Sequence, residues 1–209
     1  MKTLILVDIQ YDFLPGGALA VPQGDAVVPV ANVLARAADL VIATQDFHPP
    51  DHKSFAANHD GRDIGEVVDL DGLSQILWPV HCVQGTRGAE LVDELERERI
   101  AKVFPKGTDS SIDSYSGFFD NGHRKATGLG DYLKQQGAGQ LWVCGLATDY
   151  CVKFTVLDAL ELGFETTLVV DGCRGVNLSA GDVDAAVAAM REKGAHVAQS
   201  SALASGVLA

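Results

Sequence analysis

The fold of this chain is decided by one stretch, Gln140-Leu141-Trp142-Val143-Cys144-Gly145-Leu146-Ala147-Thr148-Asp149-Tyr150-Cys151. Its first five residues form an apolar run that has the length of a buried strand. After Cys151, residues that can face a core recur at helical spacing until Gly163 ends the pattern. A strand, a tight loop and a helix therefore follow one another, and Cys151 lies in the first turn of the helix.

A cysteine at the start of a helix has two possible roles. Free backbone N–H groups and the helix dipole favour a thiolate over a thiol there, which would make Cys151 a reactive nucleophile. Cysteine is also among the residue types most often buried for packing alone. The stretch by itself leaves both interpretations open, so the residues that accompany Cys151 in the fold have to decide between them.

Length and composition are those of an ordinary globular domain. The chain has 209 residues, of which 47% are hydrophobic and 21% charged, and we expect a single domain over 1–209. A net charge of −12 argues against a nucleic-acid surface, and no apolar segment approaches the length of a membrane span. Four cysteines without a close pair do not form a disulfide framework, so a cytoplasmic protein is expected.

Apolar runs of strand length recur along the chain, separated by helical patterns or long loops. Asp8 ends the first run, and no small-residue cleavage site follows, which favours a strand over a signal peptide. The expected strands are 3–7, 40–44, 101–104, 140–144, 166–170 and 195–199. Helices are expected from Gly24-Asp25, over 90–99 and 125–136, after Cys151 and after Asp182, with irregular segments at 45–87 and 107–122. This alternation predicts an α/β fold, a doubly wound and mostly parallel six-stranded sheet with helices on both faces.

Reactive side chains follow four of the expected strands. In open α/β sheets, ligands bind outside the carboxyl ends of the strands, where the strand order reverses. Asp8 ends the first strand, Asp46 follows the second, Lys106 follows the third and Cys151 follows the fourth. If the strands take the common order 3-2-1-4-5-6, these four strands are adjacent. The four side chains would then open into one crevice.

Asp8 and Lys106 each have a structural interpretation as well. Asp8 could cap a turn, although a carboxylate directly after five apolar residues needs a partner to offset its desolvation. A lysine in a Pro-Lys-Gly loop is usually solvated. Neither residue indicates catalysis when it is considered alone.

The segment after the second strand carries metal-type residues. Asp46-x-His48 offers a carboxylate and an imidazole, which suit zinc, iron or manganese. The residues alone leave the third ligand open among His52, His59 and His81. His123 and His196 are assigned no role.

Taken together, these motifs resemble the nicotinamidase/pyrazinamidase branch of the isochorismatase-like hydrolases. The similarity runs in the same order from about residue 3 to residue 175. Members that act on other substrates share the Asp–Lys–Cys pattern, but they are not expected to combine Asp-x-His with Trp-Pro-x-His-Cys. The matching segments are Val7-Asp8-Ile9-Gln10-Tyr11-Asp12-Phe13, Gln45-Asp46-Phe47-His48-Pro49 with His52 and Ser54-Phe55-Ala56, Trp78-Pro79-Val80-His81-Cys82-Val83-Gln84-Gly85-Thr86, Lys106-Gly107 and Gly145 to Val152.

The resemblance implies roles for individual residues, and with them one divalent transition metal, zinc first with iron or manganese as alternatives. It also implies a cis peptide bond at Leu146–Ala147. His52 matches a position near the metal whose use as a ligand differs within the family. The implied sets are a catalytic triad of Asp8, Lys106 and Cys151, metal ligands Asp46, His48 and His81, and aromatic residues Phe13, Trp78 and Tyr115 that sandwich a pyridine ring.

Amide hydrolysis needs a nucleophile, a proton carrier and donors for the developing oxyanion. Cys151 would attack the carboxamide carbon, Asp8 would carry the proton, and the backbone N–H groups of Ala147 and Cys151 would form the oxyanion hole. The expected activity is the metal-dependent hydrolysis of nicotinamide, and also of pyrazinamide, through a cysteine thioester. It would release nicotinate and ammonia and serve NAD salvage. A monomer or small homo-oligomer is expected.

Two alternatives remain. One is a related amidohydrolase with the same triad that acts on an aliphatic amide or a ureido compound. The other is a non-catalytic α/β binding module with a structural metal and buried cysteines. The donor set disfavours the second alternative, because structural zinc sites prefer four Cys/His ligands to an open set of one Asp and two His.

Overall fold

A parallel six-stranded sheet forms the centre of the computed structural model, which describes residues 1–205. Its strands are β1 (Lys2–Val7), β2 (Leu40–Asp46), β5 (Ile100–Lys106), β6 (Gln140–Leu146), β7 (Glu165–Arg174) and β8 (His196–Ala198). They lie in the order β5-β2-β1-β6-β7-β8, and each neighbouring pair is parallel. Counted along the chain, this is the predicted order 3-2-1-4-5-6, and the α/β fold class is confirmed.

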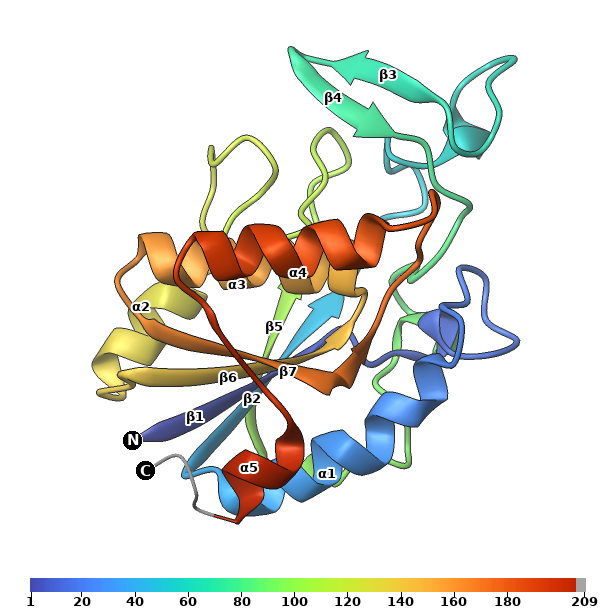
Figure 1. The fold of residues 1–209 in the computed structure, drawn as a ribbon. Coiled ribbons are helices and arrows are strands. Elements are labelled where there is room, and N and C mark those ends of the chain that lie inside the picture. The colour runs from blue at the N-terminus through green and yellow to red at the C-terminus, as the bar shows by residue number, and fades with distance from the viewer. Residues whose placement is uncertain (206–209) are drawn as a thin grey trace.

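Helices cover both faces of the sheet (Figure 1). α1 (Val27–Ala37) and α5 (Ser200–Ala204) lie on one face, and α2 (Leu129–Gln135), α3 (Lys153–Glu161) and α4 (Asp182–Glu192) lie on the other. The central strands are therefore buried on both sides and read as continuous apolar runs. Leu4, Ile5, Ile42, Val143 and Leu168 have no exposed surface. None of the helices among the described residues combines the length and the apolar character that crossing a membrane requires.

The helix predicted over 90–99 is wrong. The chain there is irregular between two short 3-10 turns, η4 (Arg87–Ala89) and η5 (Arg97–Arg99). Its backbone groups pair with the segment after β1 instead of with one another, since Val92 N–H donates to Ile9 O and Tyr11 N–H donates to Glu90 O. The apolar residues that suggested a helix are still buried, but tertiary hydrogen bonds replace the helical ones.

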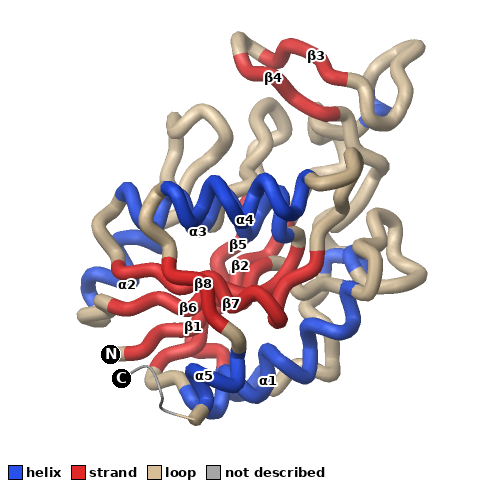
Figure 2. The backbone as a smooth tube through the Cα atoms, in the orientation of Figure 1, coloured by secondary structure: helices blue, strands red, loops and turns tan. Residues whose placement is uncertain are grey.

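The long segment 45–87 also contains structure that the sequence analysis did not predict. A short turn, η3 (Ala56–Asn58), precedes an antiparallel hairpin of β3 (Val67–Leu70) and β4 (Leu73–Ile76), which projects from the body of the molecule (Figure 2). Its turn residues Asp71 and Gly72 both have positive φ, 52° and 84°. An Asp-Gly pair is a common signal for this kind of two-residue turn.

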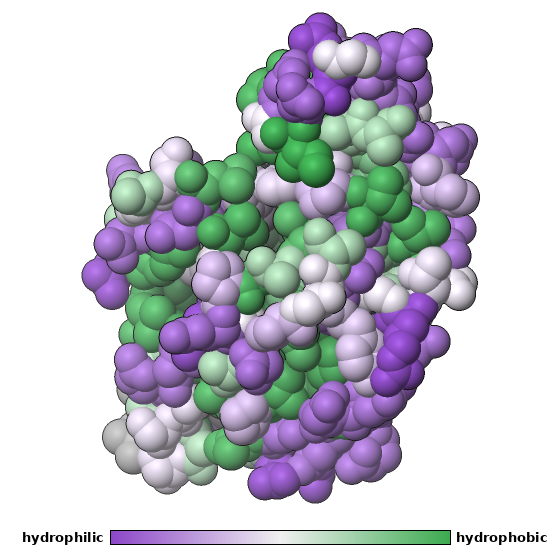
Figure 3. Space-filling view, turned by 90° about the vertical axis from the view of Figure 1, so that its right-hand side faces the viewer, coloured by the Kyte–Doolittle hydropathy of each residue, from purple (hydrophilic) through white to green (hydrophobic). Residues whose placement is uncertain are grey.

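The segments that follow β1 and β6 have different local structures. After β1 it forms the 3-10 turns η1 (Tyr11–Phe13) and η2 (Gly24–Ala26) before α1 begins. After β6 it forms a π-helical turn, η6 (Thr148–Val152), before α3 begins at Lys153. Figure 3 shows hydrophobic side chains across the middle of one side face and hydrophilic ones over its upper and lower ends.

Gly145 lies where β6 passes closest to β1, and we predict that this position tolerates no side chain. It has φ +127°, and a Cβ atom would overlap the Val7 carbonyl group. Gly145→Ala should therefore lower the free energy of unfolding by roughly 3 kcal/mol or more, as measured by urea unfolding.

The matched control is Gly137→Ala. Gly137 also has positive φ, +72°, but no atom lies within 4 Å of a Cβ built there. That variant should lose only about 1 kcal/mol, the cost of the left-handed backbone. Equal losses in the two variants would contradict a role for the close approach of β1 and β6.

Candidate active site

The carboxyl ends of four adjacent strands each supply one reactive side chain. Asp8 follows β1, Asp46 ends β2, Lys106 ends β5, and Cys151 lies in the turn after β6. All four are buried, with exposed fractions between 0% and 7%. The reversal of strand order between β1 and β6 therefore opens the crevice that the sequence analysis predicted.

The ammonium group of Lys106 is the centre of this cluster. Its Nζ lies 2.9 Å from Asp8 Oδ2 and 2.6 Å from Asp46 Oδ1. It also donates to the Ser114 carbonyl oxygen at 2.8 Å and lies 3.4 Å from Cys151 Sγ. Burial alone would lower the pKa of Lys106, but the two carboxylates hold that pKa well above its usual range. Lys106 is therefore a buried cation.

Asp8 and Cys151 lie close to each other beside Lys106. The Thr44 hydroxyl donates to Asp8 Oδ1 at 2.6 Å, and a carboxylate oxygen of Asp8 lies within 4.8 Å of Cys151 Sγ. Burial raises the pKa of the Asp8 carboxyl against the opposing effect of Lys106. A carboxyl group in this setting accepts a proton more readily than a solvated one.

The surroundings of Cys151 oppose the thiolate that a position at the start of a helix would favour. Burial raises the pKa of the Cys151 thiol well above its usual value, and Lys106 opposes this effect only in part. The residue also lies in the π-helical turn and not in the α-helix that follows. With its pKa raised in this way, Cys151 needs a nearby base to take its proton before it can act as a nucleophile.

The peptide bond between Leu146 and Ala147 is cis, as the resemblance implied. Ala147 leads directly into the turn that carries Cys151, and the Ala147 carbonyl oxygen accepts the N–H groups of Tyr150 and Val152. Ala147 and Cys151 line the same pocket.

A set of metal-type donors adjoins this cluster. Asp46, His48 and His81 each bring one donor atom within 4.8 Å of the other two. His48 Nε2 lies 3.3 Å from Asp46 Oδ2, and His81 Nε2 lies 3.5 Å from the same oxygen. Donors that share a tetrahedral zinc ion at 2.0–2.1 Å stand about 3.3 Å apart.

The two imidazoles are oriented as metal ligands usually are. His48 Nδ1 bonds the Gly107 carbonyl oxygen at 2.9 Å, and His81 Nδ1 bonds the Pro79 carbonyl oxygen at 2.8 Å. An Nδ1–H that donates to a carbonyl leaves Nε2 as the free donor for a metal. Among the described residues, the buried Nε2 atom of His48 has no hydrogen-bond partner. The residues present therefore fit a divalent transition metal.

His52 lies beside this donor set and not within it. Its ring centre is 4.3 Å from that of His48, and its Nδ1 bonds the Ser54 hydroxyl at 2.7 Å. His52, His48 and Asp113 form a second group of donors within 4.8 Å of one another. His59, the other alternative, bonds the Lys53 carbonyl oxygen at 2.7 Å and belongs to neither group.

A pocket with aromatic walls lies over these groups. Its walls include the three predicted aromatic residues Phe13, Trp78 and Tyr115, and its floor includes Cys151 and His81. The pocket is narrow, with a cavity volume of about 30 Å³.

Hydrogen bonds and edge contacts hold the aromatic walls in place. The Trp78 indole N–H donates to the Tyr115 hydroxyl at 3.1 Å. Tyr150, which the sequence analysis assigned no role, meets both rings edge-on at centroid distances of 4.9 and 5.5 Å. The one feature of the sequence that could have indicated a role for Tyr150 is its position directly before Cys151.

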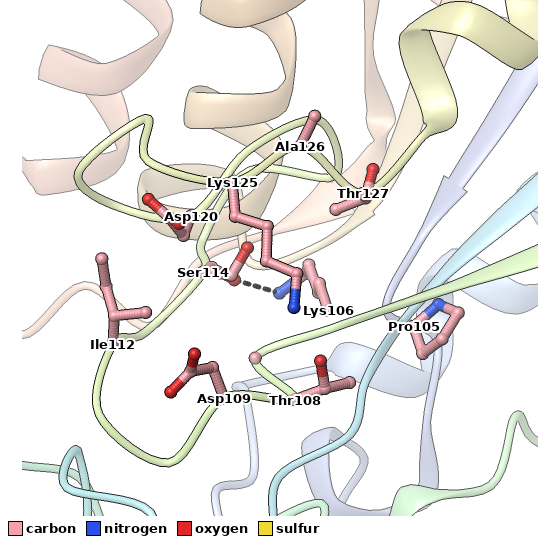
Figure 4. Close-up of a pocket in the computed structure, with 11 residues that line it drawn as sticks. Pro105, Lys106, Thr108, Asp109, Ile112, Ser114, Asp120, Lys125, Ala126 and Thr127 are labelled. Carbon is pink, nitrogen blue, oxygen red and sulfur yellow. Dashed lines mark hydrogen bonds between the residues drawn. The ribbon is translucent and has the colours of Figure 1, made fainter.

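Figure 4 shows a second cavity, lined by Lys106 and by residues of the loop after β5. Ser114 lines this cavity, whereas Asp113 and Tyr115 line the aromatic pocket. Its walls also include Lys106 and Lys125 but no cysteine or histidine. The nucleophile and the metal-type donors therefore face the aromatic pocket.

The sequence analysis assigned no individual role to three residues that support the site. Thr44 was visible only as a polar residue at the end of an apolar strand. Gln10 bridges the elements, since its amide donates to Asp46 O at 2.8 Å and accepts from Asp46 N–H at 2.8 Å. Ser114 acts through its backbone carbonyl, for which a sequence carries no signal.

Comparison with known proteins assigns the family. The model of the isochorismatase domain matches residues 2–202. The chain belongs to the isochorismatase family. It is 51% identical over 198 residues to the nicotinamidase of Escherichia coli (strain K12), which covers 93% of this chain and 92% of that protein.

Solved structures of this family agree with the assignment. The nicotinamidase pyrazinamidase of Acinetobacter baumanii superimposes with a TM-score of 0.94 at 43% identity and covers 97% of both chains. The pyrazinamidase of Pyrococcus horikoshii, solved in complex with zinc, gives a TM-score of 0.77 at 36% identity and covers 95% of this chain and 98% of that one. These similarities indicate that this isochorismatase-family chain is an amide hydrolase.

We predict that zinc retention depends on His81. Removing one of three protein ligands should weaken zinc binding by at least about 100-fold, because losses of supporting contacts alone cost about 10- to 100-fold. Metal analysis after dialysis should therefore find one zinc ion fewer in His81→Ala than in the unmodified protein. The control is His59→Ala, which leaves both donor groups intact. Equal zinc content in His81→Ala and the unmodified protein would refute the ligand set.

Proposed function

We propose that the chain is a metal-dependent nicotinamidase that hydrolyses nicotinamide to nicotinate and ammonia and also accepts pyrazinamide. The observation that carries the proposal is the pocket that Cys151, Asp46 and His81 line together. Behind it, Lys106 contacts Asp8 and Cys151, and His48 contacts Asp46. The similarity to the E. coli nicotinamidase supports the choice of substrate.

The first half of the reaction forms a thioester. Asp8 takes the proton of the Cys151 thiol, and the sulfur forms a bond to the carboxamide carbon. The carbonyl oxygen becomes an oxyanion that accepts hydrogen bonds from the backbone N–H groups of Ala147 and Cys151. Asp8 then gives the proton to the amide nitrogen, the C–N bond breaks, and ammonia leaves.

The second half releases the acid. Asp8 takes a proton from a water molecule, whose oxygen bonds to the thioester carbon. The C–S bond breaks, nicotinate leaves, and the proton returns to the sulfur of Cys151. The raised pKa of Asp8 suits this shuttle, because the group has to hold a proton between steps.

Lys106 stays charged throughout this sequence. Its ammonium group holds Asp8 at one side and Asp46 at the other, with N–O distances of 2.9 and 2.6 Å. It therefore balances two carboxylates in a site that excludes water. The same cation favours the thiolate that forms transiently at Cys151, 3.4 Å away.

Phe13, Trp78 and Tyr115 would hold the pyridine ring and keep water away from it. A divalent metal held by Asp46, His48 and His81 would supply a Lewis acid that accepts the ring nitrogen and so orients the carboxamide. Zinc is the first choice because the P. horikoshii pyrazinamidase was solved with it.

Ammonia release from nicotinamide tests the proposal and separates its alternatives. A nicotinamidase should turn the substrate over, lose this activity on treatment with a chelator and regain it with zinc. Turnover confined to aliphatic amides or ureido compounds would favour the related amidohydrolase, and no turnover of any amide would favour a binding module. Cys151→Ala should abolish ammonia release. Cys144→Ala, a buried cysteine outside the pocket, should retain it.

We further predict that Thr44 positions Asp8 through its hydroxyl group. Thr44→Val removes the donor at 2.6 Å with little change in shape. Hydrogen bonds to charged groups contribute about 1.5–3 kcal/mol, so kcat/KM for nicotinamide should fall roughly 10- to 100-fold. Thr44→Ser keeps the hydroxyl and should stay close to the unmodified protein. Equal rates in the Val and Ser variants would show that Asp8 does not depend on this bond.

A further inference from the structure

A second group of metal-type side chains lies at the far end of α3, away from the proposed active site. Asp158 and Glu161 are three residues apart on this helix and so share a face. His123 reaches the same place from the loop between β5 and α2. One donor atom from each of the three lies within 4.8 Å of the other two. Nothing in the proposed reaction uses them.

Asp158 forms the buried floor of this group. It is only 6% exposed, and its Oδ1 lies 3.3 Å from His123 Nε2. Within the part of the chain that the structure describes, no hydrogen bond of normal geometry reaches its buried Oδ2, although the Ser116 hydroxyl lies close to the carboxyl group. Burial raises the pKa of the Asp158 carboxyl, while Ser116 and His123 act in the opposite direction. A buried carboxylate oxygen without a partner costs free energy that a bound cation would offset.

The imidazole of His123 is held in position for such a cation. Its ring stacks on Phe119 with a centroid distance of 4.7 Å and an interplanar angle of 18°. The hairpin that carries it is closed by Asp120, whose Oδ1 accepts the N–H groups of Gly122 and Arg124. The positively charged side chain of the neighbouring Arg124 is engaged elsewhere, since it donates to the Asp71 carbonyl oxygen.

The spacing of the donors matches that of a shared ion. His123 Nε2 and Asp158 Oδ1 are 3.3 Å apart, the same distance that separates His48 Nε2 from Asp46 Oδ2. Two donors of a tetrahedral zinc ion stand about this far apart. One imidazole and two carboxylates suit zinc, iron or manganese better than magnesium, which prefers oxygen ligands alone.

We propose that His123, Asp158 and Glu161 bind a divalent transition metal, with zinc as the representative ion, at a second site separate from Asp46, His48 and His81. This site would join two elements that both reach the proposed active site. The loop that carries His123 also carries Tyr115 and the Ser114 carbonyl that accepts Lys106, and α3 follows the turn of Cys151. In the described residues, Gly117 N–H also donates to the Thr155 hydroxyl of α3 at 2.9 Å. A bound ion would strengthen the His123–Asp158 contact and hold the loop against the helix.

Zinc binding to the intact protein tests this inference without any measurement of activity. Metal analysis at equilibrium with free zinc should give about two ions per chain for the unmodified protein and about one for His123→Ala. Glu161→Gln changes an exposed side chain, so it provides a second variant with little risk to folding, and it should weaken the same site. The control His196→Ala removes an exposed histidine of β8 and should keep two ions. His48→Ala should lose the other ion and keep this one.

Amide hydrogen exchange provides an independent measurement of the same event. Zinc should slow exchange in peptides that cover 117–126 in the unmodified protein and in His196→Ala, but not in His123→Ala or Glu161→Gln. Equal stoichiometry in the unmodified protein and in both site variants, with no zinc-dependent protection of 117–126, would overturn the inference. The three residues would then form an ordinary surface ion pair with a neighbouring glutamate.

Discussion

The buried ammonium of Lys106 is the interaction on which the site depends. It lies between two carboxylates, Asp8 and Asp46, in a place without solvent. None of the three charges would be stable there alone, because burial of an unpaired charge costs several kcal/mol. Together they balance, and Lys106 stays protonated as a result. One side chain thus links the proposed proton carrier to the proposed metal ligands.

The parallel sheet supplies the geometry that this cluster needs. Adjacent parallel strands end at one edge, so Asp8, Asp46 and Lys106 arrive at the same level from β1, β2 and β5. The fourth strand, β6, approaches β1 so closely at Gly145 that only glycine fits. The turn that follows β6 brings Cys151 close to Asp8. Reactive groups from four strands therefore meet although they are spread over more than half of the sequence.

The loops above this edge complete the pocket and depend on it in turn. Segment 45–87 brings His48, Trp78 and His81, and the loop after β5 brings Tyr115. The Ser114 carbonyl accepts Lys106, and the Gly107 carbonyl orients His48, so the backbone of one loop supports both the buried cation and a metal-type donor. The same loop reaches α3 through Gly117 and presents His123 to Asp158. The contact between His123 and Asp158 therefore lies on the same loop as Tyr115, which belongs to the aromatic wall of the pocket.

The sequence by itself determined the α/β class and which residues end the strands, because apolar runs and the residues that end them are local properties. The strand order was assumed from the common pattern, and the resemblance implied the roles of Asp8, Lys106 and Cys151 and the cis bond at Leu146–Ala147. Only the tertiary structure decided what depends on contacts between distant segments. Residues 90–99 form no helix because their backbone pairs with the chain after β1, and burial raises the pKa of the Cys151 thiol. The support of Thr44 and the meeting of His123 with Asp158 are of the same kind. Local patterns specify elements, whereas burial and partner choice are properties of the packed chain.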